Sequence, residues 1–286
     1  MSIAASNLAL LSAALCFGCS AGEAIPPDIL DLCEYELAHA DEFDTLSIAP
    51  RSLENGEKWT AHTPWNGDFG DAVFVDPRAD RPFSVADGVL TITASRSDEG
   101  RWRSGLIAAA DATGRGWGVQ YGYFEARMKM PPGKGTWPAF WLMSLQPAKK
   151  LPKIEIDVIE YYGHMTDRFF ATTHVWQPED AEKVTSHDGS TIRVPEGSLV
   201  EEFHRYGVRV DPQHITYFLD GTEVWRQATP VELDTPLYPL VNLALGSGYP
   251  IDETPDPSRL EVDYVRVYKP AENTGSCSAS ASPAPD

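Results

Sequence analysis

Three carboxylates stand close together in residues 154–162, which read I-E-I-D-V-I-E-Y-Y. Successive side chains of a β-strand point to opposite faces, so Glu155 and Asp157 share the face opposite three apolar residues. Strict alternation would place Glu160 on the apolar face, where an unpaired carboxylate is costly. A one-residue bulge at 158–159 would remove this conflict and turn Glu160 onto the face of Glu155 and Asp157.

Two carboxylates that face one cleft suit glycoside hydrolysis. One attacks the anomeric carbon, and the other protonates the departing oxygen. Asp157, between them, would raise the pKa of its neighbours by charge repulsion and so help one glutamate to stay protonated near neutral pH. The alternative is a solvated acidic edge strand. One argument against this alternative is that a row of like charges destabilises a strand, so such a row is expected where the charges serve a function.

Aromatic residues precede and follow this acidic segment. Trp137 and Trp141 in G-T-W-P-A-F-W share a face, and so do His174 and Trp176 in T-T-H-V-W. Core packing is one explanation for the two indoles of the first segment. Binding to the apolar faces of pyranose rings is the other. His174 is either a structural histidine or a hydrogen-bond partner of an acidic side chain.

Short alternating segments bounded by turn residues must position these groups. Eight Trp, 11 Tyr and 11 Phe beside 23 Pro and 22 Gly favour many short strands over long helices. Strands at this spacing, without helical runs between them, predict an all-β antiparallel sandwich or barrel in one domain over residues 41–270. The segments with this pattern are 89–93, 121–130, 204–210, 215–219, 240–245 and 260–268.

The two ends of the chain differ from this pattern. Residues 1–22 are interpreted as a signal peptide with an apolar region at 8–18, although no Lys or Arg precedes Arg51. Cys19 is a weak match to a lipoprotein cysteine. Residues 23–40 are expected to form a linker or a short amphipathic helix, and the Ser/Ala/Pro-rich residues 271–286 a low-complexity tail. We therefore expect a secreted or periplasmic protein.

Composition narrows the possible partners. The 286 residues are 42% hydrophobic, enough for a sizeable core, and the 23 Lys and Arg against 42 Asp and Glu leave a formal net charge of −19. Phosphate backbones would be repelled, so no nucleic-acid partner is expected. No apolar run reaches the length of a membrane-spanning helix. The seven histidines have no ligand spacing, so a catalytic zinc is not expected either. We expect a monomer.

With these residues in view, E-I-D-V-I-E resembles the ExDxxE signature of glycoside hydrolase family 16, in the bulged form of its laminarinase-like branch. The similarity continues through D-E-F-D, Y-G-Y-F-E-A-R-M-K-M-P, the two aromatic segments, Y-F-L-D-G and E-V-D-Y-V-R-V-Y, in the order of the family. The signature alone is weak, but with W-P-A-F-W ahead and T-T-H-V-W behind it is specific. The resemblance implies a concanavalin-like β-jelly-roll sandwich of two antiparallel sheets.

The same resemblance implies the roles of the site residues. Glu155 matches the nucleophile, Glu160 the acid/base and Asp157 the assisting carboxylate of a retaining mechanism, which requires carboxyl groups about 5–5.5 Å apart. No cofactor is implied for catalysis. The substrate, a polysaccharide, would bind along residues that line the family's cleft: Trp137, Trp141, His174, Trp176 and, in the first long loop, Trp65 and Asn66.

Two structural features also follow from the resemblance. Many members bind a structural calcium, and the matching ligands are Asp263 and the backbone carbonyls of Gly88 and of a residue near Glu42. The first and last strands of such a jelly roll lie side by side and antiparallel. If Phe43 pairs near Val267, Cys33 and Cys277 come to the same end of these strands, and we predict a disulfide between them.

One segment departs from the laminarinase pattern. Residues 246–252 (G-S-G-Y-P-I-D), followed by an acidic Pro-rich stretch, stand where laminarinases carry a Gly/Asn/Trp-rich loop. We therefore expect an exported endo-β-glycanase for β-1,3-glucan, for mixed β-1,3/1,4-glucan or for a bacterial exopolysaccharide such as succinoglycan. The alternatives are a transglycosylase with the same site and a non-catalytic carbohydrate-binding module on the same fold, which would not need both glutamates.

Overall fold

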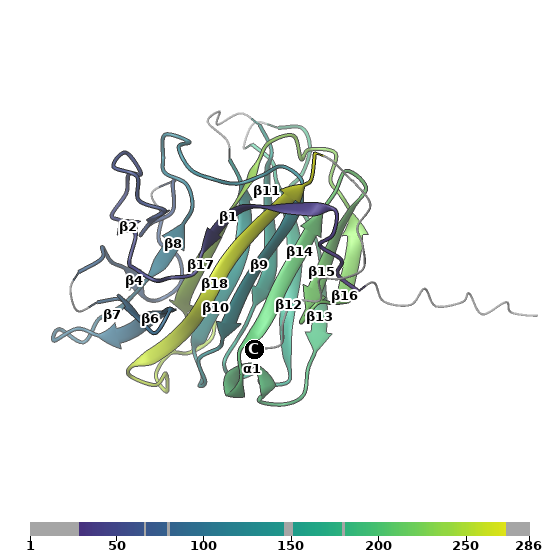
Figure 1. Cartoon of the computed structure of the whole chain (residues 1–286). Helices are drawn as coiled ribbons and strands as arrows, with labels where there is room; N and C mark the ends of the chain where they lie inside the picture. The colour runs from purple at the N-terminus through teal and green to yellow at the C-terminus, as the bar shows by residue number, and fades with distance from the viewer. Residues whose placement is uncertain (1–28, 66, 79–80, 146–150, 179–180, 273–286) are drawn as a thin grey trace, which may run out of the picture.

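The computed structural model describes residues 29–65, 67–78, 81–145, 151–178 and 181–272, which form two stacked β-sheets (Figure 1). The predicted all-β sandwich is confirmed. Most strand pairs are antiparallel, and the exceptions are the short pairs β2–β3 and β4–β7.

The first sheet has ten strands among the described residues, and the last strand of the chain runs through its middle. Along the sheet the order is β16 (Thr222–Ala228), β15 (His214–Leu219), β14 (His204–Val210), β9 (Gly122–Lys129), β18 (Ser258–Pro270), β6 (Val89–Arg96), β7 (Trp102–Ser104) and β4 (Val73–Phe74), while β1 (Tyr35–Asp41) pairs with β18 and β5 (Phe83–Ala86) with β6.

The second sheet has eight strands in the described part of the chain and carries the acidic segment. Its order is β13 (Ser186–Arg193), β12 (Arg168–Trp176), β11 (Lys153–Glu160), β10 (Thr136–Ser144), β17 (Leu237–Leu245), β8 (Leu106–Ala108), β3 (Trp59–Thr60) and β2 (Ile48–Ala49), and one short helix, α1 (Ser198–Glu201), precedes β14.

The core lies between the two sheets and follows the period of two of their strands. In β6, Leu90, Ile92 and Ala94 are fully buried while the residues between them are partly exposed. By contrast, every residue of β17 is buried, because a long loop covers its other face. Two hairpin turns, Asp87-Gly88 between β5 and β6 and Asp220-Gly221 between β15 and β16, have positive φ at both positions, as a type I′ turn requires.

The covering loop lies between β3 and β4, from Ala61 to Ala72, and contacts β10 through Phe69 and β17 through Asp71. The Asp71 N–H donates to the Leu245 carbonyl at 2.8 Å. Next to it, Gly70 has φ +72°, and a Cβ there would collide with the same carbonyl oxygen, so only glycine allows this close approach. The loop thereby holds Trp65 and Phe69 over the second sheet.

The N-terminal expectation was wrong in one respect. Residues 35–41 do not belong to a linker or helix but form β1, which pairs with the second half of β18. The backbone groups along that half of β18 need partners, and a helix this short has little stability of its own. The strand pairing is antiparallel as expected, but His39, not Phe43, stands opposite Val267.

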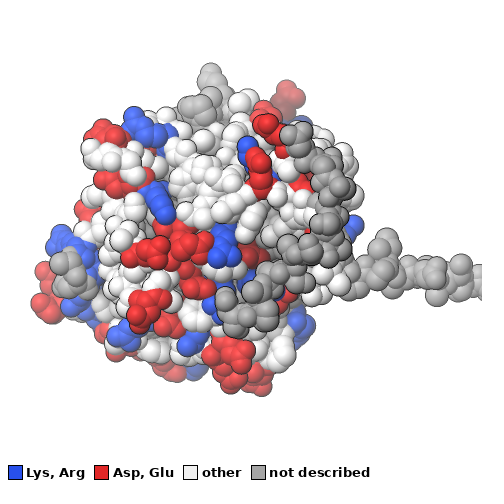
Figure 2. All heavy atoms as spheres, viewed as in Figure 1, with Lys and Arg blue, Asp and Glu red and all other residues white. Residues whose placement is uncertain are grey.

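Charged side chains of both signs are interleaved over the first sheet (Figure 2). Along its strands, Arg127 pairs with Asp263, Lys129 with Glu261 and Lys269 with Glu36. No helix in the described ranges is both long and apolar enough to span a membrane. The proposed signal peptide and Cys19 lie outside the described residues.

The residues expected to bind calcium lie near one another on this sheet. A Cβ added to Gly88 would lie 3.7 Å from the Glu42 carbonyl oxygen, and Asp263 follows the β18 residues that pair with β6. The backbone carbonyls suit calcium, which prefers oxygen ligands. The Asp263 Oδ2, however, accepts a hydrogen bond from Arg127 at 2.6 Å, so Asp263 would have to share its carboxylate between Arg127 and the ion. Calcium binding stays a prediction.

If calcium binds there, competition from Arg127 keeps the affinity weak, so millimolar concentrations are needed. We expect 5 mM CaCl₂ to raise the Tm of chelator-treated protein by about 3 °C. The same addition should leave the Tm of an Asp263→Asn variant unchanged. Differential scanning calorimetry measures both Tm values. A wild-type Tm that does not change when calcium is added would contradict the prediction.

Cys33 is disulfide-bonded, two residues before β1. Cys277 lies outside the described residues, so its pairing with Cys33 stays a prediction. It agrees with the pairing of Tyr35 with Pro270, which brings the chain after β18 to the Cys33 end.

We expect that alkylation of the purified protein without reductant labels neither Cys33 nor Cys277, and that digestion then releases one cross-linked peptide containing both. Loss of the bond in a Cys33→Ala variant should lower the free energy of unfolding by about 2–5 kcal/mol. Two alkylated thiols in unreduced protein would refute the pairing.

Candidate active site

The predicted bulge in β11 is present and places all three carboxylates on one face. On the β10 side, Phe140 stands opposite Ile159 and Trp141 opposite Asp157, so Val158 is the extra residue. The pairing with β12 shifts at the same point, between Asp157 and Glu160. Val158 and Ile159 are both buried in the core, which releases Glu160 to the opposite side.

Glu160 is held by neighbours from its own strand end and from β10. Trp137 Nε1 donates a hydrogen bond to Glu160 Oε1 at 3.0 Å, and the Tyr162 hydroxyl lies 3.5 Å from the same oxygen. The Tyr162 and Trp137 rings stack, with centroids 6.3 Å apart and planes 10° apart. Both contacts are made to Oε1 of Glu160, and they fix the orientation of its carboxyl group.

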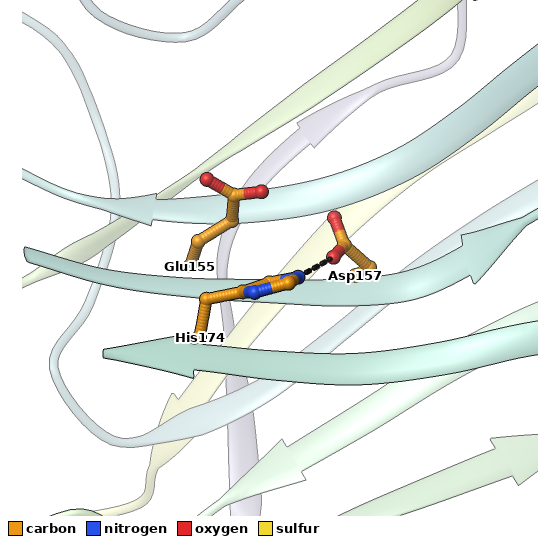
Figure 3. A group of neighbouring side chains, drawn as sticks. All are labelled: Glu155, Asp157 and His174. Carbon is orange, nitrogen blue, oxygen red and sulfur yellow. Dashed lines mark hydrogen bonds and ion pairs between the residues drawn. The ribbon is translucent and has the colours of Figure 1, made fainter. Parts of the chain in front are cut away.

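Glu155 and Asp157 are held from β12. Trp176 Nε1 donates to Glu155 Oε2 at 2.8 Å, and His174 Nε2 lies 3.1 Å from Asp157 Oδ2 (Figure 3). The His174 and Trp176 rings stack with centroids 5.1 Å apart. His174 therefore is a partner of an acidic side chain, which was one of the two roles left open by the sequence.

Burial dominates the electrostatics of this group. It raises the pKa of Glu155 to about 8, with the charge of Asp157 as the second cause, while His174 and the Trp176 hydrogen bond act in the opposite direction. Burial, followed by the charge of Glu160, raises the pKa of Asp157 well above its usual value. Asp157 is only 5% exposed, so we assign it the first proton of the pair. Once Asp157 is neutral, its charge no longer opposes ionisation of Glu155.

Glu155, Asp157 and His174 offer one potential ligand atom each within 4.8 Å of one another, the one such group of three within the described ranges. The nitrogen of His174 that would face a metal already lies against Asp157 Oδ2. Burial raises the pKa of both carboxyls, which favours protonated side chains in this cluster.

The carboxylates open into a pocket of about 160 Å³ at the centre of the second sheet. Its lining consists of the three acidic side chains and of residues from β10, β17 and the covering loop: Trp65, Phe69, Trp137, Ala139, Trp141, Glu155, Asp157, Glu160 and Asn242. Both indoles from the W-P-A-F-W segment are therefore in the site.

Strand register arranges the site as a row across the sheet. His174 on β12 stands opposite Glu155, Asp157 on β11 stands opposite Trp141, and Trp141 packs edge to face against Trp65 at 6.0 Å. Trp65, at one end of this row, is 42% exposed, and Trp176, which stacks on His174 at the other end, is 40% exposed. Large exposed indoles beside a polar pocket are typical of a ligand site rather than of a core.

Sequence reasoning missed four residues of the site. Asn242 is fully buried and accepts a hydrogen bond from Trp141 Nε1 at 2.8 Å. The sequence feature that could have identified it is a single amide side chain within the otherwise apolar strand β17. Tyr162 shares the face of Glu160 by simple alternation. Phe69 and Ser247 had no local signal, since they reach the site through loops. Asn66, which was predicted beside Trp65, lies outside the described residues.

A family model and several known proteins are similar to this chain. The family model described as "Beta-porphyranase A-D, GH16 domain" matches residues 35–270. The Endo-1,3-1,4-beta-glycanase ExsH of Rhizobium meliloti is 33% identical over 264 residues, which cover 84% of this chain and 53% of that protein. The chain thus spans about half the length of that relative.

Two further similarities cover more of the matched protein. A Beta-glucanase of Rhodothermus marinus is 30% identical over 263 residues, which cover 82% of this chain and 85% of that protein. The crystal structure of SCLam, described as a non-specific endo-beta-1,3(4)-glucanase from family GH16, matches with a TM-score of 0.67 and 25% identity, over 86% of this chain and 96% of that one.

The raised pKa values predict how stability changes with pH. Between about pH 4.5 and 8 the folded state binds more protons at Glu155 than the unfolded state does, so the free energy of unfolding falls as pH rises. Glu155→Gln removes this loss and keeps an acceptor for Trp176. We expect the variant to gain about 1–3 kcal/mol over wild type at pH 8 and almost nothing at pH 4.5.

Urea unfolding across pH 4.5–8 measures this difference. Glu54→Gln, at an exposed loop position, is the matched control and should follow wild type throughout. A difference between Glu155→Gln and wild type that does not grow with pH would contradict the assignment.

Proposed function

Because this chain belongs to glycoside hydrolase family 16, we propose that it hydrolyses internal β-glycosidic bonds of a polysaccharide with retention of configuration. The observation that carries the proposal is the bulge that turns Glu155 and Glu160 to one face inside an aromatic pocket. A pocket that only binds sugar would need the indoles, but it would not need the bulge that brings Glu160 onto the face of Glu155.

In the first step, a Glu155 oxygen attacks the anomeric carbon and forms a glycosyl ester, while Glu160 donates its proton to the departing oxygen. Trp176 donates to Glu155 Oε2 and Trp137 to Glu160 Oε1, and these hydrogen bonds fix the orientation of the two carboxyl groups. In the second step, Glu160 takes a proton from a water molecule while the oxygen of that water attacks the anomeric carbon. The ester bond to Glu155 breaks, and Glu155 leaves as a carboxylate. Asp157, protonated and held against His174, removes the charge that opposes ionisation of Glu155, and because burial still raises the pKa of Glu155, the ionised fraction of Glu155 is the form that attacks.

For the substrate we propose a β-1,3- or mixed β-1,3/1,4-glucan backbone. The support comes from the relatives, named Endo-1,3-1,4-beta-glycanase and Beta-glucanase, and from SCLam, named as an endo-beta-1,3(4)-glucanase. The family model carries a different substrate in its name, porphyran, and residues 246–252 depart from the laminarinase pattern, so a bacterial exopolysaccharide such as succinoglycan stays a candidate. We propose further that the protein is exported and acts as a monomer.

Reducing-end release from laminarin, mixed-linkage β-glucan, succinoglycan, agarose and porphyran tests the activity. We expect release from at least one glucan, loss to background in Glu155→Gln, and a fall of about 10²–10⁴-fold in Glu160→Gln. Proton NMR of the first product should show the β-anomer. Glu54→Gln serves as the control that keeps full activity.

Each alternative predicts a different result. Tight binding of a polymer without release by the wild type would support the binding module. Longer oligosaccharides that form without a matching rise in reducing ends would support transglycosylation, and an α-anomer as first product would contradict the retaining mechanism.

A further inference from the structure

A second pocket, larger than the catalytic one, lies past the ends of the strands that carry the site. It has a volume of about 290 Å³, close to the lower end, about 300 Å³, of small-molecule sites. Its lining comes from the turn before β10, the chain after β11 and the loop after β17: Lys134, Gly135, His164, Tyr249, Asp252 and Glu253.

This pocket touches the catalytic site through Tyr162. The Tyr162 ring stacks on Trp137 and packs edge to face on Tyr249, with centroids 5.2 Å apart. Its hydroxyl lies 3.5 Å from Glu160 Oε1 and 3.3 Å from the Ser247 hydroxyl. A sugar bound at Glu160 is therefore separated from the second pocket by a single aromatic ring.

The loop that forms the pocket is held in place by its backbone. Gly246 N–H donates to the Gly135 carbonyl at 2.9 Å, and Tyr249 N–H donates to the Gly246 carbonyl at 3.1 Å. Gly135 has φ +78°, and a Cβ there would collide with Thr254 Oγ1, so the loop packs directly on the glycine backbone. The pocket is thus preformed, which lowers the entropy lost when a ligand binds.

The position of the pocket decides what can reach it. The catalytic row crosses the strands, from His174 through Asp157 to Trp141 and Trp65. The second pocket lies instead along the strand direction, beyond the C-terminal end of β11 at Glu160. A polysaccharide backbone that follows the row passes beside this pocket, and only a group that projects sideways from the backbone enters it.

The lining indicates the chemistry of that group. Tyr249 and His164 form a tilted aromatic pair with centroids 4.3 Å apart, and an aromatic face suits the apolar face of a pyranose. Lys134 pairs with Glu253 at 2.6 Å, so its charge is balanced, and Asp252 adds negative charge. These carboxylates accept hydrogen bonds from sugar hydroxyls and repel a uronate or a sulfate ester.

We propose that the Tyr249–His164 pocket binds a neutral glycosyl branch carried by the backbone residue that lies at Glu160. This inference rests on the proposed function, because it takes the row as the path of the polysaccharide. It assigns to the loop after β17 the selection of a branched substrate, and to Tyr249 the main contact with the branch.

Binding to the inactive Glu155→Gln protein tests the pocket without relying on turnover. The ligands are linear laminarihexaose and the same backbone with one β-1,6-linked glucosyl branch, titrated by calorimetry. We expect the branched ligand to bind about tenfold more tightly. Adding Tyr249→Ala should remove this preference and leave the affinity for the linear ligand within twofold. Tyr249→Phe, which keeps the ring and its contact with Tyr162, should retain the preference.

Equal affinities for the two ligands, a preference that survives Tyr249→Ala, or no binding of the branched ligand would each overturn the proposal. Wild-type hydrolysis of the same two ligands, followed in parallel, reports on the proposed function alone. If the branched ligand binds with the expected preference but neither ligand is cleaved, the pocket is supported and the glycanase activity on this backbone is refuted.

Discussion

One extra residue in β11 is the feature on which the site depends. A regular strand cannot place Glu155, Asp157 and Glu160 on one face, because side chains alternate and Glu160 is an odd number of positions, five, after Glu155. Val158 breaks the alternation, and its apolar side chain joins Ile159 in the core, so the bulge is stabilised by burial on one face while it exposes a carboxylate on the other. Packing and chemistry are thereby coupled through a single backbone irregularity.

Three carboxylates in a largely buried pocket are unfavourable by themselves, and the surrounding strands compensate for them. The strands on either side of β11 each present an indole N–H to one glutamate, Trp137 from β10 and Trp176 from β12, and His174 approaches the aspartate between them. These contacts orient the carboxyl groups without neutralising them as an arginine would. Burial raises the pKa of Glu155 and of Asp157, which makes this group sensitive to pH.

Loops supply what the sheet cannot. The covering loop adds Trp65 and Phe69 to one end of the row, and the loop after β17 builds a second pocket beside Tyr162. Two glycines with positive φ allow this close backbone contact: Gly70 within the covering loop, and Gly135, just before β10, on which the loop after β17 packs. The family's chemistry thus resides on the strands, while the residues most able to change substrate preference lie on loops that the same strands hold rigid.

The sequence by itself determined the β-sandwich, the bulge and the three acidic residues, because a period of two and the cost of burying a charge are local properties of the chain. It also predicted both aromatic segments. It could not place Asn242, Phe69 or Ser247, nor show that residues 35–41 form a strand with β18, since these contacts join segments far apart in the chain. The sequence left two roles open for His174, and the 3.1 Å contact between His174 Nε2 and Asp157 Oδ2 shows that it is a partner of an acidic side chain. Tertiary structure decided those points, because hydrogen bonds and burial across strands depend on register, and register follows from the packing of the whole sandwich.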